Sequence, residues 1–356
     1  MRRVLRALLV GLCAVVAAVV GAAEYPVVRA GGELSFPLDE GSHPDYRTEW
    51  WYVTGWLRTA DGSPLGFQVT FFRSRPTLED ANPSRFAARE LVIAHAAISV
   101  PRERLWHAER IDRSAFGLAG AAVGRTDVHL RDWSLVAGEG RYRAVVRGED
   151  FALDLALERS AAVLVNGQRG YSQKGPDPAS ASYYYSVPQL VVRGTVTRDG
   201  RAVRVDGKAW LDHEWSSAYL DADSVGWDWL GLNFDDGGAL MAFRIRDSAG
   251  GARWAGGTLR TAAGVTRVLA PPDVEFTAGR AWTSPRTAIR WPVEWRVRAG
   301  PLAFDLVPLM DDQESDTRRT TGAVYWEGAV TARTPAGVMG HGYLELTGYG
   351  ERLRLR

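Results

Sequence analysis

The chain has 356 residues, with 43 Lys and Arg against 42 Asp and Glu, so its formal net charge is close to zero. Proteins that bind nucleic acid usually carry a basic excess or a basic stripe, and we expect no nucleic-acid partner here. The single cysteine, Cys13, leaves the rest of the chain without a thiol nucleophile or a disulfide. A chain of this length buries a sufficient core without such cross-links.

The first residues predict export. Three arginines precede an uncharged apolar run over residues 7–20, and the small residues Gly21, Ala22 and Ala23 follow it. This order is typical of a secretory signal peptide, and the run of about 14 apolar residues is shorter than the roughly 20 that a helix needs to span a bilayer. We therefore expect residues 1–23 to be cleaved, the protein to be periplasmic or secreted, and no integral membrane anchor to remain.

After this segment, strict alternation of apolar and polar residues is the commonest pattern. In residues 151–158 (FALDLALE) the apolar side chains point one way, whereas Asp154 and Glu158 point the other, which is typical of a half-buried strand. A short helix is expected around residues 83–90. Similar strand-like runs occur at residues 65–72, 91–100, 141–148, 189–198, 201–211, 239–247, 293–299, 323–332 and 342–349. Three Asp-Gly pairs, which are typical of tight hairpin turns, lie between such runs: Asp61-Gly62, Asp199-Gly200 and Asp236-Gly237. Together, the strands and turns predict an all-β sandwich or barrel.

Two segments of the chain are similar to each other. Residues 49–73 (EWWYVTGWLRTADGSPLGFQVTFFR) and 227–246 (WDWLGLNFDDGGALMAFRIR) share a Trp-rich start, an Asp-Gly turn and an apolar return strand. We therefore predict two related β domains, residues 24–190 and 191–356. The boundary is placed near 165–195, where the chain is rich in Gly, Pro and Ser, although the same stretch could equally form a loop that reaches over a site.

Tryptophan and tyrosine residues are concentrated in short segments. On a strand, Trp50, Tyr52 and Trp56 share one face, and Trp51 and Val53 share the other, so both faces are aromatic or apolar. A barrel whose interior holds a ligand has such faces. For any single aromatic residue the alternative is core packing, the usual role of aromatic residues in strands. Further clusters are Tyr183, Tyr184 and Tyr185, and Trp210, Trp215, Trp227 and Trp229.

Carboxyl, imidazole and indole side chains meet in the segment KAWLDHEWSS. A period of two places Trp210, Asp212 and Glu214 on one face of a strand, and it places His213 and Trp215 on the opposite face. The two carboxyl groups would lie about 7 Å apart, and burial beside an indole together with a like charge raises a carboxyl pKa towards that of a general acid. The alternatives are a solvent-facing acidic strand end and an ion pair with an arginine.

Two histidines have sequence neighbours that make them candidates for a functional site. His43, in GSHPDYRTEWWY, precedes Glu49 by six residues, and the two could meet at the mouth of a shared cavity, so both are candidate catalytic residues. His95 lies in an apolar strand. For both His43 and His95, the alternative to a catalytic role is that of a hydrogen-bonded core residue. The sequence contains no G-x-S-x-G, no H-E-x-x-H and no glycine loop for phosphates or dinucleotides, and we expect neither a metal nor a cofactor.

Four segments, FPLDEGSHPDYRTEWWYVTGWL, LDHEWSS, GWDWLGLNFDDG and YLELTGYG, follow one another in this order. With them, the chain resembles the AttH/carotenoid 1,2-hydratase family of lipocalin-like proteins over roughly residues 33–350. That family includes hydroxyneurosporene synthases, exported proteins encoded beside ABC-transport components, and related fungal pericyclases that fold a polyene. The resemblance implies two tandem lipocalin-like β-barrel domains that bind a hydrophobic small molecule, a lipid or an isoprenoid.

In the hydratases of this family, water adds across a terminal isoprenoid double bond. The resemblance implies that Asp212 protonates the alkene, that aromatic faces stabilise the resulting cation, and that His213 and Glu214 orient water or adjust the pKa of the acid. The residues expected to line the ligand cavity are Trp50, Trp51, Tyr52, Tyr184, Trp210, Trp215, Trp227 and Trp229.

Two functions stay open at this point. One is an exported binding protein that carries a lipid or isoprenoid, with ABC transporter components as partners. The other is a hydro-lyase similar to carotenoid 1,2-hydratase. The export signal favours the first, because hydratases that make pigments are expected at the inner face of the membrane, where their substrate is synthesised.

Overall fold

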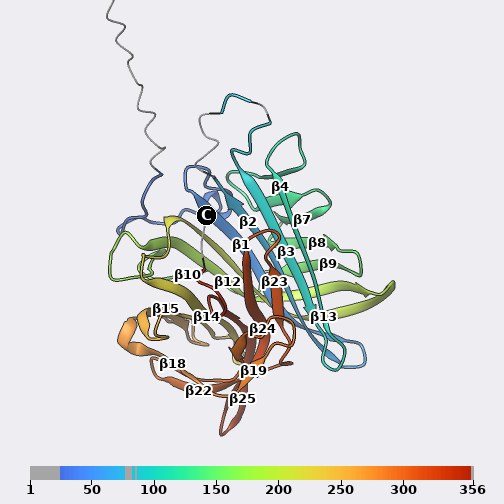
Figure 1. Cartoon of the computed structure of the whole chain (residues 1–356). Coiled ribbons are helices and arrows are strands. Elements are labelled where there is room, and N and C mark those ends of the chain that lie inside the picture. The colour runs from blue at the N-terminus through green and yellow to red at the C-terminus, as the bar shows by residue number, and fades with distance from the viewer. Residues whose placement is uncertain (1–24, 77–81, 85, 354–356) are drawn as a thin grey trace, which may run out of the picture.

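The computed structural model describes residues 25–76, 82–84 and 86–353, so the expected signal peptide lies outside the described residues. As predicted, the described chain is all-β. It forms two large antiparallel sheets, called sheet A and sheet B, and a small hairpin of β19 (Ala281–Thr283) and β20 (Arg290–Pro292) (Figure 1). Within these ranges, no helix is long and apolar enough to cross a membrane.

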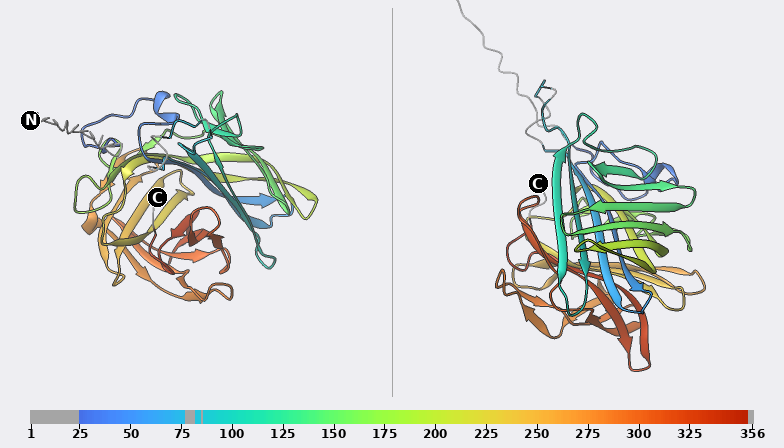
Figure 2. Two further views of the ribbon diagram at one scale, coloured as in Figure 1. Left: turned by 45° about the horizontal axis from the view of Figure 1, so that its top comes forward. Right: turned by 90° about the vertical axis from the view of Figure 1, so that its right-hand side faces the viewer.

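Sheet A contains β1 (Thr48–Thr59), β2 (Pro64–Ser74), β3 (Leu91–Ser99), β4 (Leu105–Arg113), β5 (Ala119–Ala121), β6 (Asp127–Leu130), β7 (Trp133–Gly138), β8 (Arg141–Arg147), β9 (Phe151–Glu158), β10 (Leu164–Val165), β11 (Tyr171–Gln173), β12 (Ala181–Arg198) and β13 (Arg201–Ala218). Its strand order is β4-β3-β2-β1-β13-β12-β9-β8-β7-β6-β5, and β10 and β11 pair with β12. The sheet curls into a nearly closed barrel (Figure 2).

Sheet B contains β14 (Ser224–Phe234), β15 (Ala239–Asp247), β16 (Ala252–Arg260), β17 (Thr266–Leu269), β18 (Val274–Ala278), β21 (Trp295–Ala299), β22 (Leu302–Pro308), β23 (Glu314–Thr317), β24 (Ala323–Thr334) and β25 (Gly337–Leu346). Its strand order is β17-β16-β15-β14-β25-β24-β22-β21-β18, and β23 pairs with β24. Two short 3₁₀ turns complete the described elements, η1 (Leu38–Glu40) and η3 (Pro271–Asp273).

The two sheets repeat one plan of strand pairing. Strand β1 pairs with β2 on one side and with β13, the last strand of sheet A, on the other. In the same way, β14 pairs with β15 and with β25, the last strand of sheet B. The two similar segments of the sequence are the hairpins β1–β2 and β14–β15. The fold is therefore built from two large sheets of related topology, each starting with the same kind of hairpin.

The chain passes from sheet A to sheet B between Ala218 and Ser224. The boundary predicted between residues 190 and 191 lies inside β12, which pairs with β9 and β13 of sheet A. The Gly-, Pro- and Ser-rich stretch instead brings the short strands β10 and β11 back onto β12. Sheet A therefore extends further along the chain than the N-terminal domain that the composition predicts.

Several local predictions can be compared with the backbone. At the β12–β13 turn, Asp199 and Gly200 both have positive φ, 46° and 77°, which a two-residue type I′ hairpin requires. The alternation predicted for β9 is confirmed, since its apolar residues are buried and its acidic residues are exposed. The helix expected at residues 83–90 does not form among the described residues of that segment. There, the Ser84 N–H donates to Asn82 Oδ1, a local bond that competes with a helix.

Three large apolar clusters stabilise the fold, and a small fourth one joins Val28 to Tyr171 and Ala181. The first fills the inside of sheet A, the second fills the inside of sheet B, and the third lies between the sheets. Strand β1 belongs to two of them. Trp51 and Val53 enter the first cluster, whereas Tyr52 enters the third, with Trp50 and Trp56 packed against it. Both faces of β1 are buried, which explains why both are aromatic or apolar in the sequence.

Candidate functional site

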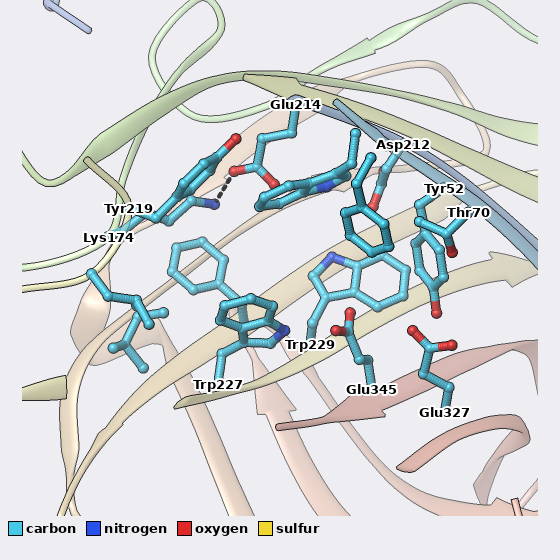
Figure 3. Close-up of a pocket in the computed structure, with 15 residues that line it drawn as sticks. Tyr52, Thr70, Lys174, Asp212, Glu214, Tyr219, Trp227, Trp229, Glu327 and Glu345 are labelled. Carbon is cyan, nitrogen blue, oxygen red and sulfur yellow. Dashed lines mark ion pairs between the residues drawn. The ribbon is translucent and has the colours of Figure 1, made fainter. Parts of the chain in front are cut away.

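A pocket lies between sheet A and sheet B, with an empty space of about 680 Å³ that includes its open mouth (Figure 3). Side chains from β1, β2 and β13 form one wall, and side chains from β14, β15, β24 and β25 form the other. The sequence pattern predicts a cavity inside a barrel, but each sheet is filled by its own apolar cluster. The cavity therefore forms where the outer faces of the sheets meet. Its apolar lining includes Trp50, Phe72, Trp227, Trp229, Phe243 and Ile245.

Asp212 is buried in the sheet A wall and accepts three hydrogen bonds. Tyr184 Oη donates to Oδ2 at 2.6 Å. Ser186 Oγ and Trp210 Nε1 donate to Oδ1 at 2.5 and 2.6 Å. Burial raises the pKa of Asp212 from 3.8 to about 7, against the opposing effect of these three bonds. A carboxyl group with such a pKa both donates and accepts a proton near neutral pH, as a general acid must.

The donors to Asp212 are themselves held in place. Trp229 Nε1, from sheet B, donates to Tyr184 Oη at 2.9 Å, and Asn166 Nδ2 donates to Ser186 Oγ at 2.8 Å. Tyr184 and Trp210, two of the residues predicted to line the ligand cavity, thus support the acid from behind. Trp210 also borders a second, more polar cavity on the far side.

Glu214, two residues further along β13, is paired with a cation. Lys174 Nζ lies 2.8 Å from Glu214 Oε1, and both side chains are buried. The ammonium also lies over the rings of Tyr184 and Phe243, 4.8 and 4.2 Å from their centroids, and these ring faces favour its charge. Lys174 belongs to the Gly-, Pro- and Ser-rich stretch, which therefore reaches the site, as one of its two predicted roles requires.

Two further carboxyl groups stand on the sheet B wall. Glu327 on β24 and Glu345 on β25 are direct cross-strand partners, and both line the pocket. Burial raises the pKa of Glu327 to about 8. Burial, and then the charge of Glu327, raise the pKa of Glu345 well above its usual range. Gln68 Nε2 donates to Glu327 Oε2 at 2.6 Å. The pocket therefore has proton-holding groups on both walls.

The predicted aromatic lining divides into two sets. Trp50, Tyr52, Trp227 and Trp229 face the pocket. Trp50 packs parallel to Trp227, with 6.3 Å between ring centroids. Trp51 and Trp215 do not face the pocket, because side chains alternate along a strand and theirs point into sheet A. Those two residues take part in another group of polar contacts.

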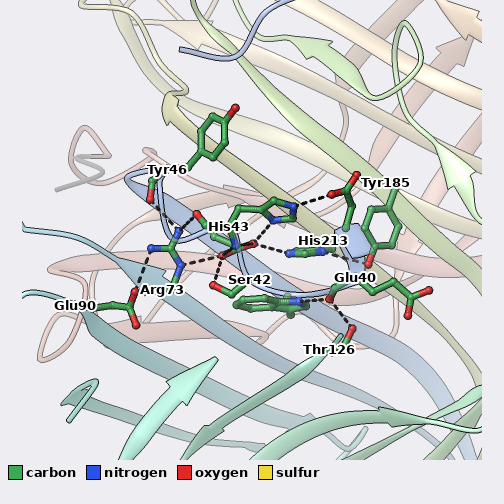
Figure 4. A network of polar contacts seen from close by, with 12 residues as sticks. Glu40, Ser42, His43, Tyr46, Arg73, Glu90, Thr126, Tyr185 and His213 are labelled. Atoms are coloured by element: carbon green, nitrogen blue, oxygen red, sulfur yellow. Dashed lines mark hydrogen bonds and ion pairs between the residues drawn. The ribbon is translucent and has the colours of Figure 1, made fainter. Parts of the chain in front are cut away.

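That group, the Glu49 cluster, consists of Glu49 and the three residues in contact with its carboxylate, His43, His213 and Arg73, which Figure 4 labels. Glu49 Oε1 lies 2.7 Å from His43 Nδ1 and 2.9 Å from His213 Nε2. Arg73 Nε donates to Glu49 Oε2 at 2.8 Å, and Arg73 also donates to the main-chain carbonyls of His43 and Tyr46. His43 and Glu49 do meet, as expected, but on the face of β13 opposite to Asp212 and Glu214.

The Glu49 cluster is a closed network. Burial opposes the charge of Glu49, but hydrogen bonds from His213 and His43 and the charge of Arg73 outweigh it and hold the pKa of Glu49 well below its usual range. Burial lowers the pKa of His213 despite its bond to Glu49. His43 stacks on Trp215, with 3.6 Å between ring centroids. The expectation that His213 orients water beside Asp212 is not met by this geometry, since period-two alternation separates the two side chains.

The ligand atoms of His43, Glu49 and His213 lie within 4.8 Å of one another, close enough for a metal ion to bridge them. In this structure Glu49 Oε1 contacts both imidazoles, and the other oxygen contacts the Arg73 guanidinium. The neighbouring cation and the completed contacts favour a structural role, which joins the segment that carries His43 to β1 and β13.

His95 fits its alternative role as a core residue. The side chain is fully buried, its Nδ1 contacts Tyr325 Oη, and its Nε2 lies 2.9 Å from Thr320 Oγ1. Burial lowers the pKa of His95 well below its usual range, so the imidazole is neutral and hydrogen-bonded.

Sequence reasoning missed Glu327, Glu345 and Lys174. A signal for the two glutamates is visible in hindsight, because each stands in an otherwise apolar alternating strand and shares its face with a tyrosine, Tyr325 or Tyr343. Lys174 has no comparable signal. It lies outside regular strands, and only the folded chain shows that it meets Glu214.

Comparisons with known proteins agree with this architecture. The AttH-like family profile matches residues 27–349. The structure of an AttH protein from Nitrosomonas europaea superposes with a TM-score of 0.86 at 49% identity, covering 92% of this chain and 100% of that one.

Two more distant structures show the same fold. Kievitone hydratase from Nectria haematococca has a TM-score of 0.68 at 16% identity, over 93% of this chain and 97% of its own. CghA with Sch210972 has a TM-score of 0.51 at 13% identity, over 85% and 89%. Such low identities speak for the fold alone. A search of curated proteins found no match. From the profile and the Nitrosomonas relative, the chain belongs to the AttH-like family.

Proposed function

We propose that this protein is a hydro-lyase that adds water to a carbon–carbon double bond of a hydrophobic isoprenoid held between the two sheets. The observation that carries the proposal is Asp212, a buried carboxyl group in an aromatic pocket whose pKa is raised to about 7. Protonation of an alkene needs an acid that keeps its proton near neutral pH, and burial supplies this property to a carboxyl group.

The surroundings of Asp212 suit both stages of the reaction. Proton transfer from Asp212 to the alkene would leave a tertiary carbocation, and the faces of Trp227 and Trp229 attract positive charge. Water then forms the new C–O bond and gives up a proton. The three hydrogen bonds to Asp212 stabilise the carboxylate that forms as the proton leaves, so they lower the barrier to transfer. The alcohol is the expected product.

The test compares the protein with Asp212→Asn and with a matched control, Asp305→Asn, which removes an exposed carboxyl group on β22. Each is incubated with neurosporene or lycopene, and the extract is analysed by mass spectrometry. A product heavier by one water, made by the protein and by Asp305→Asn but not by Asp212→Asn, supports the hydro-lyase. Conversion that survives in Asp212→Asn contradicts the role of Asp212.

Carriage of a lipid or isoprenoid without conversion is the second candidate. The observation that favours it is the mostly apolar and aromatic lining of the pocket, which holds a hydrophobic ligand whether or not the ligand reacts. The predicted export signal fits this candidate, with ABC transporter components as proposed partners. Polyene that is retained unchanged by both the protein and Asp212→Asn supports carriage, and genes for an ABC permease beside this one would favour it further.

A further inference from the structure

A row of polar side chains crosses the outer face of sheet A, from Asp212 to the edge of the sheet. Asp212 on β13 is directly opposite Tyr52 on β1, and Tyr52 is opposite Thr70 on β2. Thr70 is opposite His95 on β3, and His95 is opposite Glu109 on β4, the edge strand. By contrast, the neighbouring row on the same face is apolar across β1 to β4, where it consists of Trp50, Phe72, Ile93 and Ile111.

The outer part of the polar row is joined by a continuous chain of hydrogen bonds. Thr320 Oγ1 donates to Glu109 Oε2 at 2.5 Å, so its only hydroxyl hydrogen is used. His95 Nε2, 2.9 Å from Thr320 Oγ1, must therefore be the donor of that bond. Burial lowers the pKa of His95 and keeps the ring neutral, so Nδ1 is an acceptor and Tyr325 Oη donates to it. Every bond of the chain points from Tyr325 towards Glu109, which is partly exposed.

Thr70 lies at the inner end, where the chain meets the pocket. Its side chain lines the pocket and is 2% exposed, yet Thr70 Oγ1 has no hydrogen-bond partner among the described residues. Figure 3 shows Thr70 next to Tyr52 on the wall that carries Asp212. Buried polar atoms are rarely left unsatisfied, so Thr70 indicates a place for a water molecule. Tyr325 contacts His95, the neighbour of Thr70 in the row, and its oxygen can accept a hydrogen bond from that water.

We propose that Thr70 holds the water molecule that attacks the cation, and that the chain behind it carries the proton given up by that water to Glu109. The proton passes through Tyr325, His95 and Thr320 in turn. A neutral imidazole can serve this purpose without becoming charged, because it takes a proton at Nδ1 as it releases the one at Nε2. The proposal rests on the proposed function and supplies the proton acceptor that the hydration step needs.

The place of the alkene follows from the register of the strands. Directly opposed residues of an antiparallel pair have Cβ atoms about 5 Å apart, so Asp212 and Thr70 are separated by about 10 Å, with Tyr52 between them. All three side chains line the pocket. An alkene that lies over Tyr52 would therefore have the acid on one side and the water on the other, along a single wall.

The protons balance over one turnover. Asp212 gives its proton to one alkene carbon, and the water oxygen bonds to the adjacent carbon. A water proton then enters the chain at Tyr325 as another proton leaves it for the Glu109 carboxylate. The products are the alcohol, the Asp212 carboxylate and a protonated Glu109. After the alcohol leaves, passage in the reverse direction and through water in the emptied pocket returns a proton to Asp212. The reverse passage also restores the tautomer of His95, and no other reactant is needed.

The first test needs no substrate. A crystal structure of the protein without ligand should contain an ordered water within about 3 Å of both Thr70 Oγ1 and Tyr325 Oη. Nitrogen-15 NMR should show His95 with a proton on Nε2 and none on Nδ1. A Thr70 hydroxyl without a water, or with one that does not reach Tyr325, overturns the relay. A proton on Nδ1 of His95 overturns the direction assigned to the chain.

The second test measures lycopene hydration. Thr70→Val should lower kcat about 100-fold and Glu109→Gln about tenfold, with KM unchanged in both, because proton transfer is slowed and binding is not. The solvent deuterium isotope effect on kcat should increase in both variants, which a purely structural role would not cause. Thr70→Val removes no hydrogen bond to a described residue, so its urea unfolding midpoint should stay the same.

Two matched controls lie outside the row. Ser99→Ala removes another buried hydroxyl of sheet A, and Glu139→Gln removes an exposed carboxyl group, so neither should change kcat. An unchanged kcat in Thr70→Val or Glu109→Gln, or an equal loss in the controls, overturns the proposal. If the protein makes no alcohol, the proposed function has failed, and with it the task of the relay, whereas the crystal structure and NMR still decide whether the bound water and the oriented chain exist.

Discussion

Asp212 and Glu49 are both buried carboxyl groups of sheet A, on opposite faces of paired strands, yet their pKa values move in opposite directions. Burial raises the pKa of Asp212, which has only neutral donors around it. Glu49 is equally buried, but two imidazoles and the Arg73 guanidinium hold its pKa well below the usual range. The partners decide the difference, because hydrogen bonds from His213 and His43, and then the charge of Arg73, compensate Glu49 for the loss of solvation that burial imposes.

This contrast separates a candidate catalytic site from a structural one. A carboxylate that is locked in its charged form by an arginine cannot serve as an acid near neutral pH, whereas one with neutral donors can. Residue type alone does not distinguish them, since both regions combine carboxyl and aromatic side chains. The partners of each carboxyl group are what assign its role.

Glu49→Gln should give the largest loss of stability. The substitution leaves the buried Arg73 guanidinium with only the longer, 3.4 Å contact to the partly exposed Glu90 carboxylate, and breaking a buried pair in this way costs about 3–5 kcal/mol. Urea unfolding at neutral pH measures the loss. The exposed pair of Asp154 and Arg143 provides the control, and Asp154→Asn should cost less than about 1 kcal/mol. Equal losses in the two variants would remove the basis for calling the Glu49 cluster structural.

Asp212→Asn should change how stability depends on pH. The carboxyl group ionises near 3.8 when unfolded and near 7 when folded, so the folded state binds more protons between these values and this group makes stability fall as pH rises through them. The corresponding free energy is at most about 4 kcal/mol. Relative to the protein, the variant should therefore gain stability from about pH 4 to about pH 7.

Unfolding of both proteins in urea at several pH values measures this gain. Glu49 has the opposite sign, because its pKa is lowered on folding, so its contribution is present above its ordinary pKa and is lost in acid. A constant difference between Asp212→Asn and the protein at every pH would show that the Asp212 pKa is not raised.

Lys174→Met should have an intermediate effect. It leaves the Glu214 carboxylate buried without its cation, which costs about 2–3 kcal/mol. The double variant Lys174→Met, Glu214→Gln should recover most of the loss, since no unpaired charge remains. Thermal and urea unfolding of the single and double variants test this expectation, and a double variant as unstable as the single one would argue that Lys174 acts through packing instead.

Trp50→Phe and Trp51→Phe should give the smallest but most selective difference. Trp50 faces the pocket, so its replacement should weaken lycopene binding about 2–10-fold. Trp51 stacks on His213 inside sheet A, so its replacement should lower stability and leave affinity unchanged. Fluorescence titration and urea unfolding separate the two effects. Equal affinity losses in both variants would contradict the assignment of the two faces of β1.

Local patterns predicted the parts of this structure that depend on neighbouring residues. The alternation in residues 151–158, the Asp-Gly hairpins and the separation of Asp212 from His213 all follow from the geometry of a strand. The resemblance in the LDHEW and EWWY segments added the lipocalin-like fold, which the AttH-like relatives share. The helix near residue 83 failed because a side-chain bond at Asn82 competes with it.

The sequence by itself determined the strands, their faces and the repeated hairpin, because these rest on a period of two and on turn chemistry. Only the tertiary structure decided that the cavity lies between the sheets, that Lys174 pairs with Glu214, and that Glu327 and Glu345 stand opposite Asp212. Those contacts join segments that lie far apart along the chain. Their positions depend on how two curved sheets pack, which no local pattern records.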